Sequence, residues 1–165
     1  METMTHKNSI LRPKIALYEP DIPQNTASII RTCSCLGAYL EIIEPCGFLL
    51  SDKRFKRVVM DYMDLDKIKF YSSAEEFFEK KIDQRVILMT TKTKKIYYDF
   101  KFKKDDTILF GRESLGVPNQ IHKKVNDRLK VPLIENKRSL NLSTTVSIVL
   151  AENLRQTNYL YGSKS

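Results

Sequence analysis

Short apolar runs alternate with segments of helical periodicity along most of the chain. The first helical segment repeats small and aliphatic side chains at Ala27, Ile30, Cys33 and Leu36, and Gly37 then supplies a typical helix end. Strands are predicted over 14–18, 39–43, 69–71, 85–91, 107–110 and 129–132, and helices over 24–36, 51–60, 73–81, 118–125 and 143–161. This alternation predicts an α/β fold whose mainly parallel sheet is covered by helices on both faces.

Caps and strand ends refine this prediction. Ser51 is expected to cap the second helix, and Ser73 with Glu76 has the spacing of a capping box for the third. Ligands of parallel sheets bind beyond the carboxyl ends of the strands. Candidate site residues are therefore expected just after the predicted strands.

The length of 165 residues predicts one domain spanning 1–165, with residues 1–13 as a flexible N-terminal tail. Lys plus Arg is 28 and Asp plus Glu is 20, so the net charge of +8 favours a polyanionic partner, nucleic acid ahead of a membrane. No run approaches the ~18 apolar residues of a membrane span. Cys33, Cys35 and Cys46 match no zinc spacing, so we expect a cytoplasmic protein without disulfides or metal.

The glycines and histidines exclude several kinds of chemistry. None of the five glycines forms a G-x-G pair, which excludes the Rossmann fingerprint. Gly111 and Gly116 have the spacing of a P-loop, but Val117 stands where that motif needs lysine. His6 lies in the expected tail and His122 in a polar helix, which disfavours a histidine-centred triad. Any chemistry is therefore expected from Arg, Glu, Asn, Ser and backbone groups.

Two polar segments stand at a helix start and at a strand end. Residues 25–31 (NTASIIR) contain Asn25 and Arg31, whose ordinary roles would be a helix cap and a surface charge. Residues 109–118 (LFGRESLGVP) leave a strand at Gly111, where a glycine lets the backbone approach a ligand closely. Glu113 would then lie in the ligand crevice, or be solvated in a plain turn.

A third polar segment, residues 137–143 (KRSLNLS), precedes the last predicted helix. Leu140 and Leu142 are expected to pack inward, while Ser139, Asn141 and Ser143 face another way and can meet a ligand. The ordinary alternative is a long N-terminal cap for the helix.

Two basic segments are candidates for a nucleic-acid surface. One is the helix predicted over 51–60, which carries Lys53, Arg54, Lys56 and Arg57. The other is the stretch 92–104, in which aromatic side chains interleave with Lys92, Lys94, Lys95, Lys101, Lys103 and Lys104. The alternative for both is a solvated face, with the aromatic rings of 92–104 tucked into the core.

Taken together and in this order, NTASIIR, FGRESLGVP and KRSLNLS resemble the SpoU branch of the SPOUT class of RNA methyltransferases. The resemblance covers nearly the whole chain. Further stretches (LYEPDIPQ, IEPCGF, Asp61-Tyr62, TTK at 90–92 and AENLRQ) are similar to the small enzymes of this branch that act on the wobble nucleotide of tRNA. The resemblance implies a SPOUT fold with a C-terminal trefoil knot, and a homodimer whose active site lies near the interface.

The resemblance also implies a reaction: methyl transfer from S-adenosylmethionine to the ribose 2′-OH of a cytidine or modified uridine at position 34, in the tRNA anticodon stem-loop. Carried over residue by residue, the cofactor contacts are Met89, Thr90, Gly111, Val131, Ser139 and Leu140. The implied catalytic residues are Arg31, Asn25, Glu113, Ser139 and Asn141.

Arg31 is the implied base or hydroxyl activator. Arginine normally stays protonated, so we favour stabilisation of the alkoxide or of a backbone phosphate by its charge. Asn25 would position Arg31 or the ribose, and Glu113 would orient donors around the site. The chain departs from the family at Ala27, usually glycine, at Arg112, commonly proline or serine, and at Thr144-Thr145, usually Asn-Ala or Asn-Ser. Arg112 is expected to add positive charge beside the site.

Two other functions stay open at this point. One is a methyltransferase of the same branch that acts on another tRNA nucleotide or on rRNA. The other is a non-catalytic RNA-binding dimer that kept the fold. Retention of the implied catalytic residues argues against the second.

Overall fold

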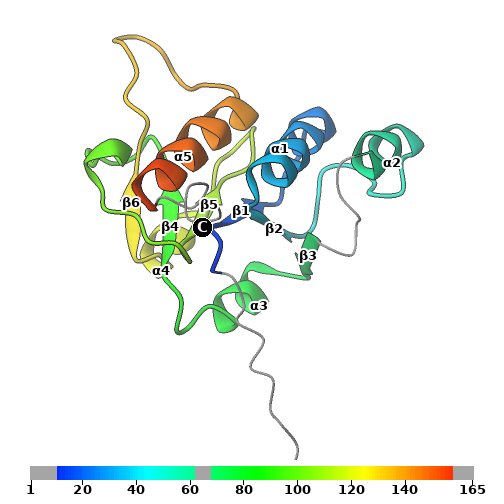
Figure 1. The fold of residues 1–165 in the computed structure, drawn as a ribbon, viewed down its shortest axis with the longest axis horizontal. Helices are drawn as coiled ribbons and strands as arrows, with labels where there is room; N and C mark the ends of the chain where they lie inside the picture. The colour runs from blue at the N-terminus through cyan, green and yellow to red at the C-terminus, as the bar shows by residue number, and fades with distance from the viewer. Residues whose placement is uncertain (1–10, 62–67, 158–165) are drawn as a thin grey trace, which may run out of the picture.

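The computed structural model describes residues 11–61 and 68–157, which form a six-stranded parallel sheet with the order β3-β2-β1-β5-β4-β6 (Figure 1). The strands are β1 (Lys14–Tyr18), β2 (Tyr39–Ile43), β3 (Ile68–Tyr71), β4 (Val86–Met89), β5 (Thr107–Phe110) and β6 (Asp127–Leu129). The helices are α1 (Pro23–Leu36), α2 (Lys53–Met60), α3 (Ala74–Glu79), α4 (Asn119–Lys124) and α5 (Leu142–Thr157), with a short 3-10 turn, η2 (Tyr97–Asp99). The α/β prediction is confirmed. None of the described helices is long and apolar enough to cross a membrane.

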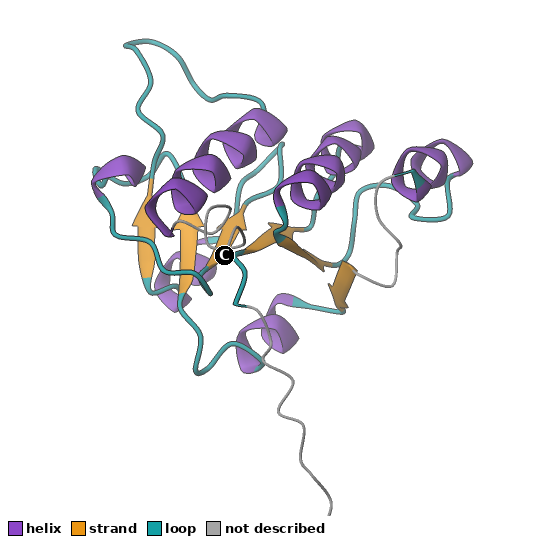
Figure 2. Ribbon diagram, in the orientation of Figure 1, coloured by secondary structure: helices purple, strands orange, loops and turns teal. Residues whose placement is uncertain are grey.

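Helices cover both faces of the sheet: α1, α2 and α5 lie on one face, and α3 and α4 on the other (Figure 2). Side chains alternate along a strand. In β1, Ile15 and Leu17 therefore join the cluster that contains α1 and α5, whereas Ala16 and Tyr18 pack with α3 and α4. Both faces of the central strands are buried, which explains their short, continuously apolar runs.

Helix α1 follows the sequence prediction closely. It ends at Gly37, whose φ of 75° is the left-handed conformation that glycine adopts without strain. Its buried face includes Ile30 and Cys33. Burial raises the pKa of the Cys33 thiol to about 12, so this side chain is a packing group.

The sixth strand was predicted wrongly over 129–132. It covers Asp127–Leu129, and only Leu129 within it is buried. Beyond it, Lys130 forms only an isolated bridge with Ile96. The strand is an edge strand with charged side chains, so its hydrophobic pattern is weak.

Two predicted caps also differ from the structure. Asp52, and not Ser51, caps α2, where its carboxylate accepts a hydrogen bond from the Arg54 N–H at 2.8 Å. At α3, the Ser73 hydroxyl accepts from the Glu76 N–H at 3.2 Å, as predicted. The Glu76 carboxylate reaches Ser72 instead of Ser73, so only half of the capping box forms.

Several predictions from the sequence concern residues that lie partly or wholly outside the described ranges. Residues 1–10 of the expected tail, Tyr62, and the predicted end of the last helix at 161 lie outside them. Pro13, expected in the tail, is buried, and its carbonyl accepts a hydrogen bond from the Tyr39 N–H at 2.9 Å. Pro13 therefore belongs to the folded domain.

The lysine-rich stretch 92–104 runs from the side of the sheet where the strands end to the side where they begin. It leaves the carboxyl end of β4 and returns to the amino end of β5. Phe100 and Phe102 are buried, and Gln156 of α5 holds this stretch through the Phe102 N–H (2.9 Å) and the Phe100 carbonyl (2.9 Å). The lysines of the stretch are therefore divided between opposite edges and do not share one surface.

Candidate active site

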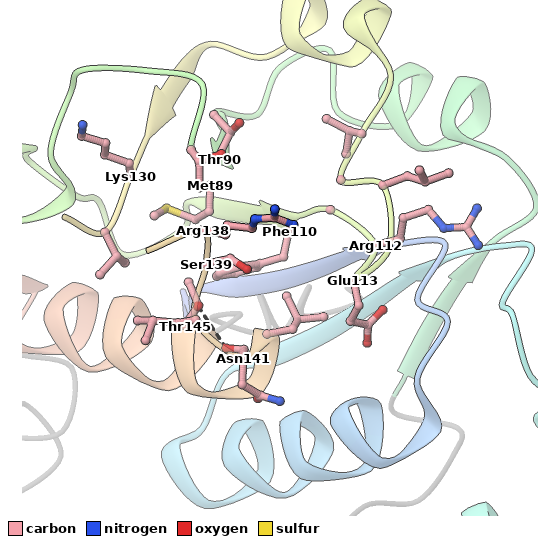
Figure 3. A pocket seen from close by; sticks show the side chains of 18 of the residues that line it. Met89, Thr90, Phe110, Arg112, Glu113, Lys130, Arg138, Ser139, Asn141 and Thr145 are labelled. Carbon is pink, nitrogen blue, oxygen red and sulfur yellow. Dashed lines mark hydrogen bonds between the residues drawn. The ribbon is translucent and has the colours of Figure 1, made fainter. Parts of the chain in front are cut away.

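A cavity of about 580 Å³ opens at the carboxyl ends of β4 and β5 (Figure 3). Its walls come from segments that follow β4, β5 and β6 and from the start of α5. They include 89–92, 110–113, 115–117, 130–131 and 138–142, together with Ile22, Asn25, His122, Leu133 and Thr145. The chain leaves β1 toward β2 on one side and leaves β5 toward β6 on the other, so the neighbouring carboxyl ends of β1 and β5 form the switch point where such sheets bind ligands.

The loop after β5 is folded tightly by its two glycines. The Arg112 N–H donates to the Gly116 carbonyl at 3.1 Å, and the Gly116 N–H donates back to the Arg112 carbonyl at 2.9 Å. A Cβ on Gly111 would lie 2.7 Å from the Gly116 Cα, and Gly116 itself has a φ of 63°. Position 111 therefore needs glycine because a side chain would meet the backbone of Gly116, and position 116 favours glycine because of its left-handed conformation. The loop folded in this way presents Glu113 to the cavity.

Three polar residues that are far apart in the sequence form one hydrogen-bonded chain. The Asn141 amide oxygen accepts from the Ser143 N–H (2.9 Å) and the Thr144 N–H (3.3 Å) at the start of α5. Its Nδ2 group then donates to the Asn25 Oδ1 atom at 2.9 Å. The Asn25 Nδ2 group donates to the Glu113 carboxylate at 3.2 Å. The first turn of α5 thus fixes the orientation of both amides, and Figure 3 shows the Glu113 and Asn141 side chains directed toward α1.

Asp21 completes this network, and sequence reasoning had assigned it no role. The Asp21 N–H donates to the Glu113 carboxylate at 3.0 Å, and the Glu113 N–H donates to the Asp21 carboxylate at 3.2 Å. The Ser114 hydroxyl also donates to Asp21. The LYEPDIP stretch contained the residue, but its contact with Glu113 spans 92 positions of sequence, so no local pattern could reveal it.

These contacts shift the two acids in opposite directions. Hydrogen bonding with Glu113, supported by Ser114 and Arg112, lowers the pKa of Asp21 to about 2. Burial raises the pKa of Glu113, and its hydrogen bond with Asp21 raises it further. Of these two carboxyl groups, Asp21 therefore ionises first as the pH rises, and Glu113 is the one that lines the cavity.

Arg112 does not present the unbalanced positive charge that its sequence position predicted. Its guanidinium donates to Asp21 and to Glu19, each at 3.4 Å. The two carboxylates offset its charge, so Arg112 braces the loop that holds Glu113.

The structure brings most of the sequence-predicted site residues together. The implied cofactor residues all line the cavity: Met89, Thr90, Gly111, Val131, Ser139 and Leu140. The inward packing expected for Leu140 is wrong, because its side chain is 40 % exposed and lines the cavity beside Ser139. Leu142, also expected to pack inward, is partly buried against the core but lines the cavity as well.

Arg31 is the exception. It lies on an exposed part of α1 and is not among the residues that line the cavity. It follows Asn25 by six positions, which places the two side chains about 120° apart around the helix. Asn25 is buried and reaches Glu113, while Arg31 faces away from that contact.

His122, Lys130 and Arg138 line the cavity, although sequence reasoning gave them no role in the site. The polar helix around His122 had been used only to disfavour a histidine-centred triad. The feature that could have found it is the preceding glycine loop, which brings the start of α4 back to the carboxyl edge of the sheet.

This fold and cavity define a SpoU-type methyltransferase domain: the chain belongs to the SpoU rRNA Methylase family, whose family model matches residues 12–151. A tRNA (cytidine(34)-2′-O)-methyltransferase from Beijerinckia indica is 43% identical over 148 residues, covering 88% of this chain and 92% of that protein. A solved structure described for the 2-OH methylation of C/U34 on tRNA has a TM-score of 0.82 and 34% identity, covering 92% of this chain and 97% of the other.

A more distant solved structure has the same fold. An AdoMet-bound rRNA methyltransferase from Sinorhizobium meliloti has a TM-score of 0.79 at 22% identity, covering 87% of this chain and 56% of the other. The SPOUT-type α/β fold expected from the sequence is therefore confirmed. The trefoil knot stays a prediction.

Proposed function

We propose that this protein transfers a methyl group from S-adenosylmethionine to the ribose 2′-OH of nucleotide 34, the wobble nucleotide, of tRNA. The observation that carries the proposal is the Glu113–Asn25–Asn141 chain beside a cavity lined by all six implied cofactor residues. The 43% identity to a tRNA (cytidine(34)-2′-O)-methyltransferase supports the substrate and the position.

The cavity fits S-adenosylmethionine in size and chemistry. Its volume of about 580 Å³ lies within the ~300–1,000 Å³ range of small-molecule sites. Phe110, Val131 and Leu140 offer apolar walls for an adenine ring, and Thr90 and Ser139 offer hydroxyls to the polar ends of the cofactor. When bound, the cofactor supplies an electrophilic methyl group on its sulfonium.

Residues of this chain would orient the ribose and interact with the charge that develops on its 2′-oxygen during the transfer. Glu113, held by Asn25 and Asp21, presents a fixed carboxylate to the cavity. Asn141 ties Asn25 to α5, and Ser139 lines the same wall. Positioning of this kind brings the reacting atoms to about 3–3.5 Å, which accounts for much of the rate increase in such transfers.

Arg31 would stabilise the developing alkoxide or a backbone phosphate by its charge. Because it lies outside the cavity of its own chain, it would act within the homodimer that the family resemblance implies. We place the protein in the cytoplasm, where its tRNA substrate is modified.

The testing experiment combines purified protein, labelled S-adenosylmethionine and unmodified tRNA, followed by digestion and mapping of the labelled nucleoside. The proposal predicts label on the 2′-oxygen of nucleotide 34. Label elsewhere keeps the chemistry and rejects the position. No label together with no cofactor binding favours the non-catalytic RNA-binding alternative. Arg31→Ala should abolish transfer and leave cofactor binding intact, and loss of cofactor binding would contradict its role.

A further inference from the structure

Lys92, His122 and Lys130 line the cavity, and Arg128 lies near His122; we call these four residues the basic wall. Lys92 follows β4, Lys130 follows β6, and both line the cavity together with His122 of α4. Arg128 lies in β6, close enough to His122 to act on it electrostatically. Three separate parts of the chain, the segment after β4, helix α4 and the β6 region, therefore place basic or protonatable residues at or beside the cavity.

The cations of the basic wall stand outside the ion pairs of the described residues. Within the described residues, no carboxylate forms an ion pair with Lys92, Arg128 or Lys130. The nearby carboxylate of Asp127 is engaged by Lys95, with 2.6 Å between Nζ and Oδ1. Burial and the charges of Lys92 and Arg128 lower the pKa of His122. A bound anion would relieve this repulsion between like charges.

The opposite side of the cavity has the reverse character. Glu113 and Arg112 lie at the end away from Lys130 (Figure 3), and Arg112 is already shared between Asp21 and Glu19. Around Arg112, the three carboxylates of Glu19, Asp21 and Glu113 outnumber its guanidinium, which disfavours a phosphate at this end of the cavity. An RNA backbone that delivers its ribose to Glu113 is therefore favoured along the basic wall and disfavoured over the acidic side.

The other basic segments are poorly placed for this task. Lys101 and Lys103 lie near the amino ends of β4 and β5. Arg85, just before β4, donates to the Lys101 carbonyl and to Asp106, and the Lys103 N–H donates to Asp106, just before β5. Helix α2 lies beyond α1, away from α5 (Figure 1). Of the six lysines in 92–104, only Lys92 reaches the cavity.

We propose that Lys92, His122, Arg128 and Lys130 bind the backbone phosphates of the RNA beside the nucleotide whose ribose enters the cavity. The proposal rests on the proposed function and adds the side of the site from which the RNA approaches. Lys92 and Lys130 make the contacts nearest the ribose, and Arg128 extends the track along β6.

The test compares two double variants that each remove two lysine charges. Lys92→Gln/Lys130→Gln alters the basic wall, and Lys69→Gln/Lys80→Gln alters exposed lysines near the β3 edge. The Kd for unmodified tRNA is measured between 50 and 200 mM salt, and the Kd for S-adenosylmethionine is measured separately. The wall variant should lose about 10-fold in tRNA affinity, and the slope of log K against log[salt] should fall by about 1.4–1.8, since each lost phosphate contact accounts for ~0.7–0.9. The control variant should stay within about twofold of wild type in tRNA affinity. In the wall variant, the loss of tRNA affinity should exceed any loss of cofactor affinity.

Two results would overturn the inference. One is a wall variant that binds tRNA as tightly as the control. The other is a wall variant that loses cofactor affinity and keeps tRNA affinity, which would assign the wall to the cofactor carboxylate. The single variants Lys92→Gln and Lys130→Gln, each expected to change the slope by about half as much, serve if the double variant does not fold. A wild-type protein that binds no tRNA would instead contradict the proposed function.

Discussion

The two sides of the cavity differ in whether their polar and charged side chains have partners among the described residues. On the β1–β5 side, Asp21, Glu113, Asn25 and Asn141 satisfy one another through hydrogen bonds that join three separate parts of the chain. On the β6–α4 side, the lysines of the basic wall are left without carboxylate partners among the described residues. A satisfied network holds its groups in fixed places, whereas unpaired charge is available to a ligand. We infer that the first side positions the reacting ribose and the second side binds the RNA that carries it.

Within the hydrogen-bonded network, the largest expected effect comes from removing the Glu113 carboxylate. Glu113→Ala removes the acceptor of both the Asn25 amide and the Asp21 N–H, so kcat should fall by about 10²–10³-fold, the range found when one positioned polar group is removed from an active site. Cofactor affinity should change by less than about threefold, because Glu113 contributes position and not the bulk of the binding surface. Single-turnover methylation and equilibrium binding measure the two quantities. Glu113→Gln is the matched control and should recover part of the rate, since it keeps one oxygen acceptor. A Glu113→Ala enzyme with normal kcat would contradict this assignment.

A smaller and more specific effect is expected at Asp21. Its hydrogen bond with Glu113 raises the pKa of Glu113, so Asp21→Asn should lower that pKa and move the acidic limb of the pH–rate profile to lower pH. Because looser positioning accompanies the change, kcat should fall by about 10-fold. The measurement is kcat against pH for wild type and variant. An unchanged acidic limb would show that Glu113 titration does not control the reaction.

Asp21 also links pH to stability. The pKa of Asp21 in the folded protein, about 2, lies below its ordinary value of 3.8. The ionised carboxylate therefore stabilises the fold above pH 4, and this contribution is lost as the pH falls from about 4 to about 2. Urea unfolding across this range should show a smaller acid-dependent loss of stability in Asp21→Asn than in wild type. Equal losses in the two proteins would contradict the link.

The glycine loop that presents Glu113 allows a matched pair of stability tests. In Gly111→Ala the new Cβ meets Gly116 backbone at 2.7 Å, so the loop must shift, at a cost of about 1–3 kcal/mol. In Gly116→Ala nothing lies within 4 Å of the new Cβ, and only the left-handed φ costs energy, about 1 kcal/mol. Urea denaturation measures both. The explanation fails if Gly116→Ala is the more destabilised variant.

The smallest effect is expected far from both sides of the cavity. Lys56→Gln/Arg57→Gln removes two exposed charges from α2, and tRNA affinity should fall by less than about threefold, through the general field alone. Filter binding at fixed salt compares this variant with Lys92→Gln/Lys130→Gln. A larger loss in the α2 variant would move the RNA surface to that helix.

The sequence was sufficient where structure is decided locally. The runs 14–18, 39–43 and 107–110 match β1, β2 and β5 because central strands are continuously apolar and end at a proline, a glycine or a polar turn. It failed at β6, where an edge strand carries Asp127 and Arg128 and buries only Leu129.

In the candidate site, too, sequence predicted the residues that belong to local motifs and missed those that depend on distant contacts. Family motifs located Glu113, Asn25 and Asn141, and the structure explains how they meet. Asp21 was missed because its partner lies 92 residues away. Leu140 was misplaced because alternation along a segment predicts burial only for a regular strand, and residues 137–141 are irregular.

The most direct test of the division between the two sides is the single-turnover methylation rate at saturating tRNA and saturating S-adenosylmethionine. If the basic wall only binds RNA, Lys92→Gln/Lys130→Gln should recover to within about twofold of the wild-type rate once tRNA saturates, whereas Glu113→Ala should remain about 10²–10³-fold slower. A wall variant that stays slow at saturation, or a Glu113→Ala enzyme that recovers, would contradict the account.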